Sequence, residues 1–301
     1  MPSEVEHKVM KLQKFVIDLR KGQQFHLGAI GHMDETPMFF DLPGNRTVDL
    51  NGTSTVPIKT SGAEKQHFTI ILSCLADGIK LKPAVVFKRK TMPKEKLPKD
   101  IIVFVQEKGW VDERVLFGWL REVWFKRPGA LLNGKSMLVW DIFHAHLLDS
   151  VKSELKRNRT YQCVIPGGCT SLLQPLDVCL NKPFKVPMRQ KWNEWMVNGE
   201  KQLTKVGNLK RLELATVCQW IVDSWNEILS DMVIRSLLKC GISKSIDGSE
   251  DDELFSEFIG SRDDVELEEN TEECDFYDDG LSEEQFCKLF GDSNNEDFEV
   301  F

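Results

Sequence analysis

The chain has 301 residues, of which 41% are hydrophobic, and a formal net charge of −8; the bulk of it is therefore expected to fold, as one large domain or two small ones. Its eight cysteines include no Cys-x-x-Cys pair, which argues against a disulfide framework and against a zinc site. No apolar run approaches the roughly 18 residues of a membrane span, and the charged N-terminal residues carry no cleavable targeting pattern, so no membrane association is expected.

The first half of the chain is predicted to form one helix and three strands. Residues 5–22 carry apolar side chains at helical spacing. Apolar runs predict strands at 27–34, 67–75 and 83–87. The first of these strands ends at Asp34, and the second is closed by Asp77-Gly78, a dipeptide typical of hairpin turns.

The second half is predicted to be richer in helix. The pattern indicates helices at 112–125 and 147–157, short strands at 137–141 and 162–166, and a largely helical region at 183–239. The strand at 137–141 again ends at an aspartate, Asp141, and Gly167-Gly168 interrupts the chain before the run that leads to Asp177. We therefore predict an α/β domain with a mixed five-stranded central sheet flanked by helices, and a helical C-terminal part.

The composition changes abruptly near residue 247. Residues 247–301 contain 22 acidic and two basic residues, a net charge of −20, whereas residues 1–246 carry a net charge of +12. We therefore predict a domain at 5–246 and an acidic, largely disordered tail at 247–301. A basic body with an acidic tail favours nucleic-acid binding. The tail has three candidate roles: to mimic DNA, to keep the protein soluble, or to bind basic nuclear proteins.

Three apolar stretches each deliver an aspartate at or just beyond their C-terminal ends: Asp34, Asp141 and Asp177. Side chains at strand ends are presented at the rim of a sheet, where sites tend to assemble. Three carboxylates brought together repel one another, and a divalent cation such as Mg²⁺ or Mn²⁺ removes that penalty. Taken singly, however, each aspartate is also typical of a turn or a helix cap, so spacing alone does not decide between these interpretations.

The local sequences around the three aspartates resemble a known family. They read Gly31-His-Met-Asp34-Glu-Thr-Pro37, Leu138-Val-Trp-Asp141-Ile-Phe-His-Ala-His146 and Ile165-Pro-Gly-Gly-Cys-Thr-Ser-Leu-Leu-Gln-Pro-Leu-Asp177. In this order they resemble the three signature blocks of the pogo/Tigger branch of DDE transposases, a superfamily that includes jerky-like and centromere-protein-B-like domesticated proteins. The resemblance covers roughly residues 5–252, and several motifs in one order are far more specific than any single pattern.

This resemblance implies an RNase H-like fold and a DDE superfamily endonuclease, which cleaves DNA phosphodiesters and, in a complete transposase, transfers the cut strand. Asp34, Asp141 and Asp177 are then the implied catalytic residues and the ligands of two Mg²⁺ (or Mn²⁺) ions, with water or a DNA 3′-hydroxyl as the nucleophile. DNA is the implied partner and the nucleus the implied location, and a homodimer is a further hypothesis.

Two residues near the aspartates have roles that the sequence leaves open. Glu35 belongs to the first block, but its side chain should point to the opposite face of the strand from Asp34, so it is not assigned as a ligand. His146 stands where family members often have histidine. It is a candidate to orient a ligand or to contact a phosphate, and a purely structural histidine is an equal alternative.

The sequence also departs from the family. Ile142 follows Asp141 where the family commonly has Asn, so any contribution of that Asn is absent. Full transposases of this type carry helix-turn-helix domains before the catalytic domain, and only four residues precede residue 5 here. Two hypotheses follow: a nuclease domain that is a fragment or partial product, or a domesticated, non-catalytic nuclear scaffold that binds DNA or chromatin. A general RNase H-type nuclease is a third.

A dense set of basic residues surrounds the predicted hairpin and the loop after it. Because affinity for DNA comes mainly from neutralising phosphates, these residues are expected to contact the DNA backbone, the alternative being a solvated loop. The set comprises Lys80, Lys82, Lys88, Arg89, Lys90, Lys94, Lys96 and Lys99.

Overall fold

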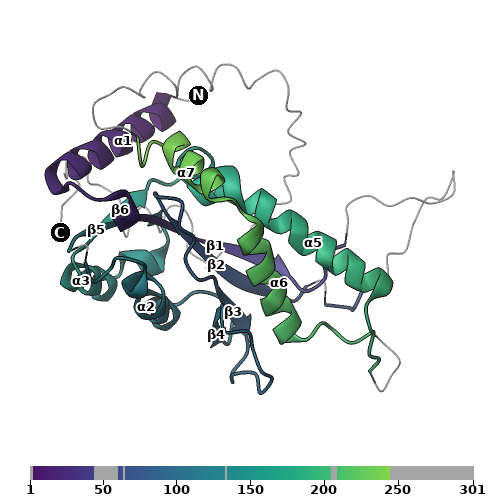
Figure 1. Ribbon diagram of the computed structural model, residues 1–301. Helices are drawn as coiled ribbons and strands as arrows, with labels where there is room; N and C mark the ends of the chain where they lie inside the picture. Colours follow the sequence, from purple (N-terminus) through teal and green to yellow (C-terminus); the bar gives the residue numbers. More distant parts are fainter. Residues whose placement is uncertain (1–2, 44–59, 64, 133, 205–208, 245–301) are drawn as a thin grey trace, which may run out of the picture. The chain divides into compact units, whose positions relative to one another are not determined.

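The computed structural model describes residues 3–43, 60–63, 65–132, 134–204 and 209–244. Figure 1 shows a central sheet with helices on both faces, and the strand order is β4-β3-β2-β1-β5-β6. The strands are β1 (Ile30–Phe39), β2 (His67–Leu75), β3 (Ala84–Lys88), β4 (Ile102–Gln106), β5 (Ser136–Asp141) and β6 (Thr160–Ile165). Parallel and antiparallel pairs are both present. The predicted α/β class and mixed sheet are therefore confirmed, with six strands in place of five.

The helices divide between the two faces of the sheet. Helices α1, α5, α6 and α7 contribute to one apolar core, and α2 and α3 contribute to the other. Their bounds are α1 (Ser3–Gln23), α2 (Glu113–Glu122), α3 (Asp149–Arg157), α5 (Asn181–Asn198), α6 (Leu214–Glu227) and α7 (Ser230–Lys239), with a single turn α4 (Thr170–Leu173) before α5. The helical C-terminal part of the prediction is confirmed, although the described residues between α5 and α6, 199–204 and 209–213, carry no helix.

Strand β1 shows why the sheet has two cores. Ile30 and Met38 pack into the core of α1, α5, α6 and α7, whereas Met33 packs into the core of α2 and α3. This follows from the strand geometry, in which successive side chains point to opposite faces. By the same alternation Asp34 shares a face with Ile30, and Glu35 shares a face with Met33.

The prediction that the first strand ends at Asp34 was wrong, because β1 continues to Phe39. Beyond His32 no further pairing with β5 is formed, and β1 pairs with β2 alone. Pro37 lies in this stretch, opposite Thr69 of β2. A proline lacks the N–H that a central strand needs, and it is tolerated where one side of the strand is unpaired. Asp34 therefore lies where β5 ends, and not where β1 ends.

The sixth strand, β4, was missed by the sequence analysis. All five of its residues are half-buried, and it pairs only with β3, in parallel, at the edge of the sheet. A short edge strand without a clear alternation between buried and exposed residues gives little period-two signal. It also follows the basic loop after β3, which carries neither helix nor strand.

The predicted acidic tail at 247–301 lies outside the described residues, so the boundary between it and the domain at 5–246 stays a prediction. The six cysteines in the described part of the chain form no disulfide. None of the described helices is long and apolar enough to cross a membrane.

Candidate functional site

Asp34 and Asp141 come from neighbouring strands that run in the same direction. β1 pairs with β5 in parallel, with His32 opposite Val139. The same register continued by two residues brings Asp34 beside Asp141, the last residue of β5. Asp34 is almost fully buried, with 6% of its surface exposed, whereas Asp141 is partly exposed. The register of two parallel strands is therefore what brings the first two predicted residues together.

Asp177 reaches the same place through a tight reversal after β6. Cys169 donates its backbone N–H to the carbonyl of Pro166, and Gly168 within this turn has a φ of +79°, which a residue with a side chain rarely adopts. The chain then passes through α4 into a π-helical turn, Leu176–Leu180, which contacts β1. Wide turns of this kind are frequent at functional sites, and this one contains Asp177.

Two buried amides hold the carboxylates of Asp34 and Asp177. Asn181 donates from Nδ2 to Oδ2 of Asp34 at 3.1 Å and to Oδ1 of Asp177 at 2.6 Å. Gln174 donates from Nε2 to the other oxygen of Asp34, Oδ1, at 2.5 Å. One amide thus joins two of the three aspartates, and the site fixes their relative orientation without any positive charge in these contacts.

The carboxylates are close enough to oppose one another's ionisation. Burial raises the pKa of Asp34 well above its usual range, and the charges of Asp177, Glu35 and Asp141 raise it further, while the Asn181 hydrogen bond lowers it. Burial also raises the pKa of Asp177, against the lowering effect of Asn181 and of the Lys185 ammonium group. Asp34 is buried, whereas Asp141 is partly exposed and Asp177 is exposed. A concentration of negative charge around a buried carboxylate is a condition that favours a bound cation.

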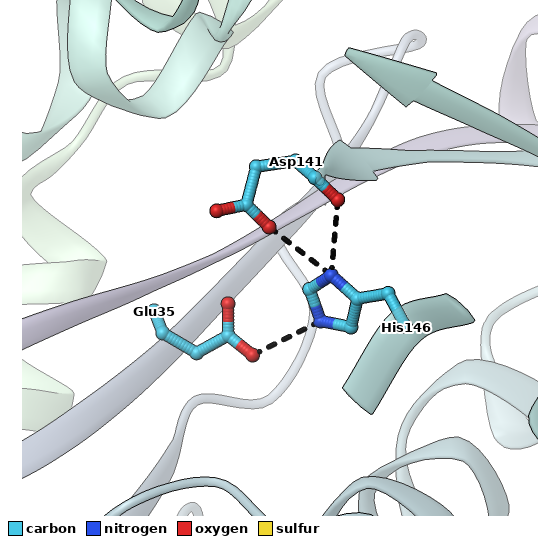
Figure 2. Close-up of side chains that lie close together, drawn as sticks. All are labelled: Glu35, Asp141 and His146. Atoms are coloured by element: carbon cyan, nitrogen blue, oxygen red, sulfur yellow. Dashed lines mark hydrogen bonds and ion pairs between the residues drawn. The ribbon is translucent and has the colours of Figure 1, made fainter. Parts of the chain in front are cut away.

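His146 connects Asp141 to Glu35, as Figure 2 shows. Its Nε2 lies 3.2 Å from Oε1 of Glu35, and its Nδ1 lies 3.1 Å from Oδ1 of Asp141 and 3.2 Å from the backbone oxygen of that residue. The imidazole is fully buried and stacks on Trp140, with ring centres 4.2 Å apart and planes within 4°. Phe143 packs edge-on against it. His146 is therefore held from three sides.

This environment favours the charged form of the histidine. Burial alone would lower the pKa of His146, but the carboxylates of Glu35 and Asp141 outweigh burial and raise the pKa to about 10. An imidazolium donates from both ring nitrogens, here from Nε2 to the Glu35 carboxylate and from Nδ1 to the backbone oxygen of Asp141. The Asp141 carboxylate is in addition close enough for an ion pair. Among the described residues, the ligand atoms of Glu35, Asp141 and His146 lie within 4.8 Å of one another, whereas the three aspartates do not form such a group. A metal ion bound to His146 would require a neutral imidazole. Both ring nitrogens already contact oxygen atoms of Glu35 and Asp141, so the geometry favours hydrogen bonding over ligation at this histidine.

Of the roles that the sequence left open for His146, the structure excludes one. A side chain with no exposed surface does not reach a phosphate in solution, so direct phosphate contact is ruled out. Two roles remain, a residue that orients Asp141 and a purely structural histidine. Glu35 lies on the opposite face of β1 from Asp34, as the strand alternation predicts, yet it joins the site through His146. Glu35, Gln174 and Asn181 were not identified from the sequence as parts of the site.

The aspartates fit a hard divalent cation. Their donors are carboxylate oxygens, the ligands that Mg²⁺ and Mn²⁺ prefer. Two further oxygens beside them, Oε1 of Gln174 and Oδ1 of Asn181, are buried and have no hydrogen-bond partner within the described residues. Unpartnered buried oxygens next to crowded carboxylates are expected where a cation or its bound water completes the arrangement.

One of the basic residues expected to contact DNA, Lys80, is bound to another part of the protein instead. Lys80 donates from Nζ to the backbone oxygens of Trp225, Asn226 and Ile228 at the C-terminal end of α6. A cation at a helix C-terminus satisfies free carbonyls and the helix dipole. For Lys80 the expectation of DNA contact was therefore wrong. Lys82 donates to the backbone oxygen of Lys99 at an exposed site.

Comparison with known proteins bears on the same part of the chain. The model of the DDE superfamily endonuclease family matches residues 65–237, a range that contains Asp141 and Asp177 and begins after Asp34. The human protein "Pogo transposable element with KRAB domain" is 34% identical over 255 residues, which are 85% of this chain and 42% of that protein. The human protein "Pogo transposable element with ZNF domain" is 31% identical over 195 residues, covering 64% of this chain and 14% of that protein.

A solved structure shares the fold. In a pre-cleavage Mos1 transpososome, the transposase chain matches 85% of this chain over 63% of its own length, with a TM-score of 0.51 and 14% sequence identity. At that identity the likeness concerns the fold, which supports the RNase H-like expectation. The chain spans less than half the length of the curated relatives described above.

Proposed function

The chain belongs to the DDE superfamily endonuclease family, and on that premise we propose that it cleaves phosphodiester bonds in DNA with the help of divalent cations. In a complete transposase the same centre would also carry out strand transfer. The proposal is supported by the Asn181 amide, which joins the carboxylates of Asp34 and Asp177. It is also supported by Asp141, whose charge raises the pKa of both of these aspartates.

In this proposal Asp34, Asp141 and Asp177 are the catalytic residues and the metal ligands. Two Mg²⁺ or Mn²⁺ ions bound there would activate the attacking oxygen and stabilise the leaving oxygen of the phosphodiester. The remaining residues act on the aspartates. Asn181 and Gln174 fix the carboxylates of Asp34 and Asp177, and His146 fixes that of Asp141. Such supporting hydrogen bonds preserve ligand orientation.

The partners and the location are part of the same proposal. We propose the nucleus as the location of a chain that acts on DNA, and the structure that shares its fold is a pre-cleavage Mos1 transpososome. We propose DNA as the partner, residues 5–246 as the catalytic domain, and a homodimer as the acting form. Basic nuclear proteins remain the proposed partners of residues 247–301, whose net charge of −20 would attract them.

A nicking assay tests the proposal directly. The full chain, stripped of metal with a chelator, is expected to leave supercoiled plasmid intact and to nick it when Mg²⁺ or Mn²⁺ is added in excess. Gel electrophoresis of the relaxed form measures the reaction. A protein that binds plasmid but never nicks it would support the non-catalytic scaffold instead. Faster cleavage of an RNA–DNA hybrid than of duplex DNA would support a general RNase H-type nuclease.

A further inference from the structure

A hollow of about 470 Å³ lies away from the three aspartates, next to the end of β1. Phe40, the residue after β1, lines it together with His67 at the start of β2 and Lys88 at the end of β3. β2 is antiparallel to both β1 and β3, and β1 is parallel to β5. The C-terminal ends of β1, β3 and β5 therefore lie along the same side of the sheet, which is called here the C-terminal edge. The hollow therefore lies at the same edge as Asp141.

The distance between Asp34 and the hollow follows from the number of residues between Asp34 and Phe40 along β1. Asp34 precedes Phe40 by six residues of almost continuous strand, which at about 3.3 Å per residue is about 20 Å. The rise of duplex DNA is about 3.4 Å per base pair, so about six base-pair steps cover the same length. One DNA molecule bound at the aspartates is thus long enough to pass over the hollow.

The residues that line this hollow are mostly basic, and the hollow is called the basic hollow below. Its positively charged residues are Lys65, Lys88, Arg89, Lys90 and Arg211, and its only acidic lining residue among those described is Glu107. The ammonium group of Lys90 is 4.0 Å from Glu107, and both side chains are mostly exposed, so this pair neutralises little. The five positive charges and one negative charge give the lining a net charge of +4, which is the electrostatic pattern of an anion site.

Arg211 is fixed in place although it lies on the surface. Its guanidinium carbon lies 4.4 Å from the ring centre of Phe40, and its Nη1 donates to Oε1 of Gln66 at 2.7 Å. An arginine has five N–H donors, and this contact uses one of them. A side chain held by a ring and by one hydrogen bond has less rotamer freedom to lose when it binds a ligand. Arg211 is therefore prepared to bind a phosphate through its other donors.

The positive charges oppose one another, as they would at a site completed by an anion. Partial burial lowers the pKa of Arg211, and the charge of Arg89 lowers it further, although Glu95 raises it. Burial likewise lowers the pKa of His67, with Lys88 adding to the effect. A bound anion would relieve the repulsion in both cases.

We propose that the basic hollow binds a phosphate-bearing nucleotide of a DNA strand, separately from the three aspartates and at the same edge of the sheet. Phosphates contact the arginine and lysine side chains, and the volume is within the range of sites for small molecules the size of a nucleotide. The inference rests on the proposed function, since it places the DNA at this edge. It adds a second anchor, which binds DNA whether or not cleavage occurs.

Salt-dependent binding tests the anchor in the full chain. The double variant Arg211→Gln/Lys88→Gln and the matched control Arg157→Gln/Lys135→Gln each remove two positive charges. Arg157 and Lys135 lie at the opposite edge of the sheet, just before β6 and β5. Fluorescence anisotropy with a labelled 30-base-pair duplex, without divalent cations, measures affinity between 50 and 200 mM salt. Unfolding midpoints verify that both proteins fold.

The double variant is expected to lower the slope of log affinity against log salt by about 1.8, at about 0.9 per lost phosphate contact, and the control is expected to keep the wild-type slope. Equal slopes in the two variants would overturn the anchor, and so would a wild type that binds no duplex. A further outcome concerns free nucleotides. If the wild type binds deoxyadenosine monophosphate and the double variant does not, while both bind duplex DNA equally well, the hollow is a site for a free nucleotide and the proposal is overturned. Duplex binding without metal-dependent nicking would contradict only the proposed function.

Discussion

Replacement of Asp34 by asparagine is expected to abolish DNA cleavage, a loss of at least about 1,000-fold, the upper range seen when one preorganised electrostatic contact is removed from an active site. Asp34 is the most buried of the three aspartates and accepts hydrogen bonds from both amides of the site. An amide in its place keeps the shape but removes the charge that a divalent cation needs.

The same substitution is expected to stabilise the metal-free protein by about 0.5–2 kcal/mol, the range that single stabilising substitutions commonly reach. Asp34 is buried beside the charges of Asp177, Glu35 and Asp141, and asparagine removes this repulsion. The new amide group also finds partners, because Oε1 of Gln174 and Oδ1 of Asn181 have none within the described residues. A rotation of either amide pairs its oxygen with the new N–H₂ group.

Activity and stability therefore change in opposite directions in this variant. Plasmid nicking measures the first, and urea unfolding without metal measures the second. Asp149→Asn serves as the control, since the Asp149 side chain is fully exposed, and it is expected to change neither quantity. An Asp34→Asn protein that nicks DNA at the wild-type rate would remove Asp34 from the catalytic centre. A large loss of stability would show that Asp34 has a structural role instead.

The second large effect is expected at His146. Replacement by alanine removes the group between the carboxylates of Glu35 and Asp141 and empties the space against Trp140. Removal of one partner of a buried ion pair costs about 3–5 kcal/mol. The free energy of unfolding measured in urea is expected to fall by that amount, and nicking is expected to fall by about 10- to 100-fold, the range for residues that orient metal ligands.

His144 provides a matched control two residues away. It lies in the same short turn, His144–Leu147, but is exposed, so His144→Ala is expected to change stability by less than about 0.5 kcal/mol. If His146→Ala does not fold, Glu35→Gln tests the same contact, because it keeps the size of the side chain and removes one carboxylate. Equal stability and activity in the two histidine variants would contradict the role of His146.

The sequence predicted the elements around the aspartates because the signals there are local. The strand at 67–75 was predicted with the bounds that the structure has, since a continuous apolar run closed by Asp77-Gly78 determines both of its ends. Gly167-Gly168 correctly marked the reversal after β6, which needs the positive φ of Gly168. The side chains of Asp34 and Glu35 point to opposite faces for the same local reason.

What the sequence did not predict depends on partners far away along the chain. The end of β1 is set by pairing with β2 and by the short reach of β5, which the residues of β1 do not encode. Gln174 and Glu35 meet Asp34 and His146 only after folding. Asn181 carried a usable signal, because it follows Asp177 by four residues in a helical segment, a spacing that brings side chains together.

Mn²⁺ binding to the metal-free full chain, measured by titration calorimetry, tests most directly whether the three aspartates form one metal centre. The wild type and Asp149→Asn are expected to give the same binding heat, and Asp141→Asn is expected to lose the tight component. The acidic residues at 247–301 contribute the same background to all three proteins. Equal tight binding in the wild type and in Asp141→Asn would contradict the metal centre proposed here.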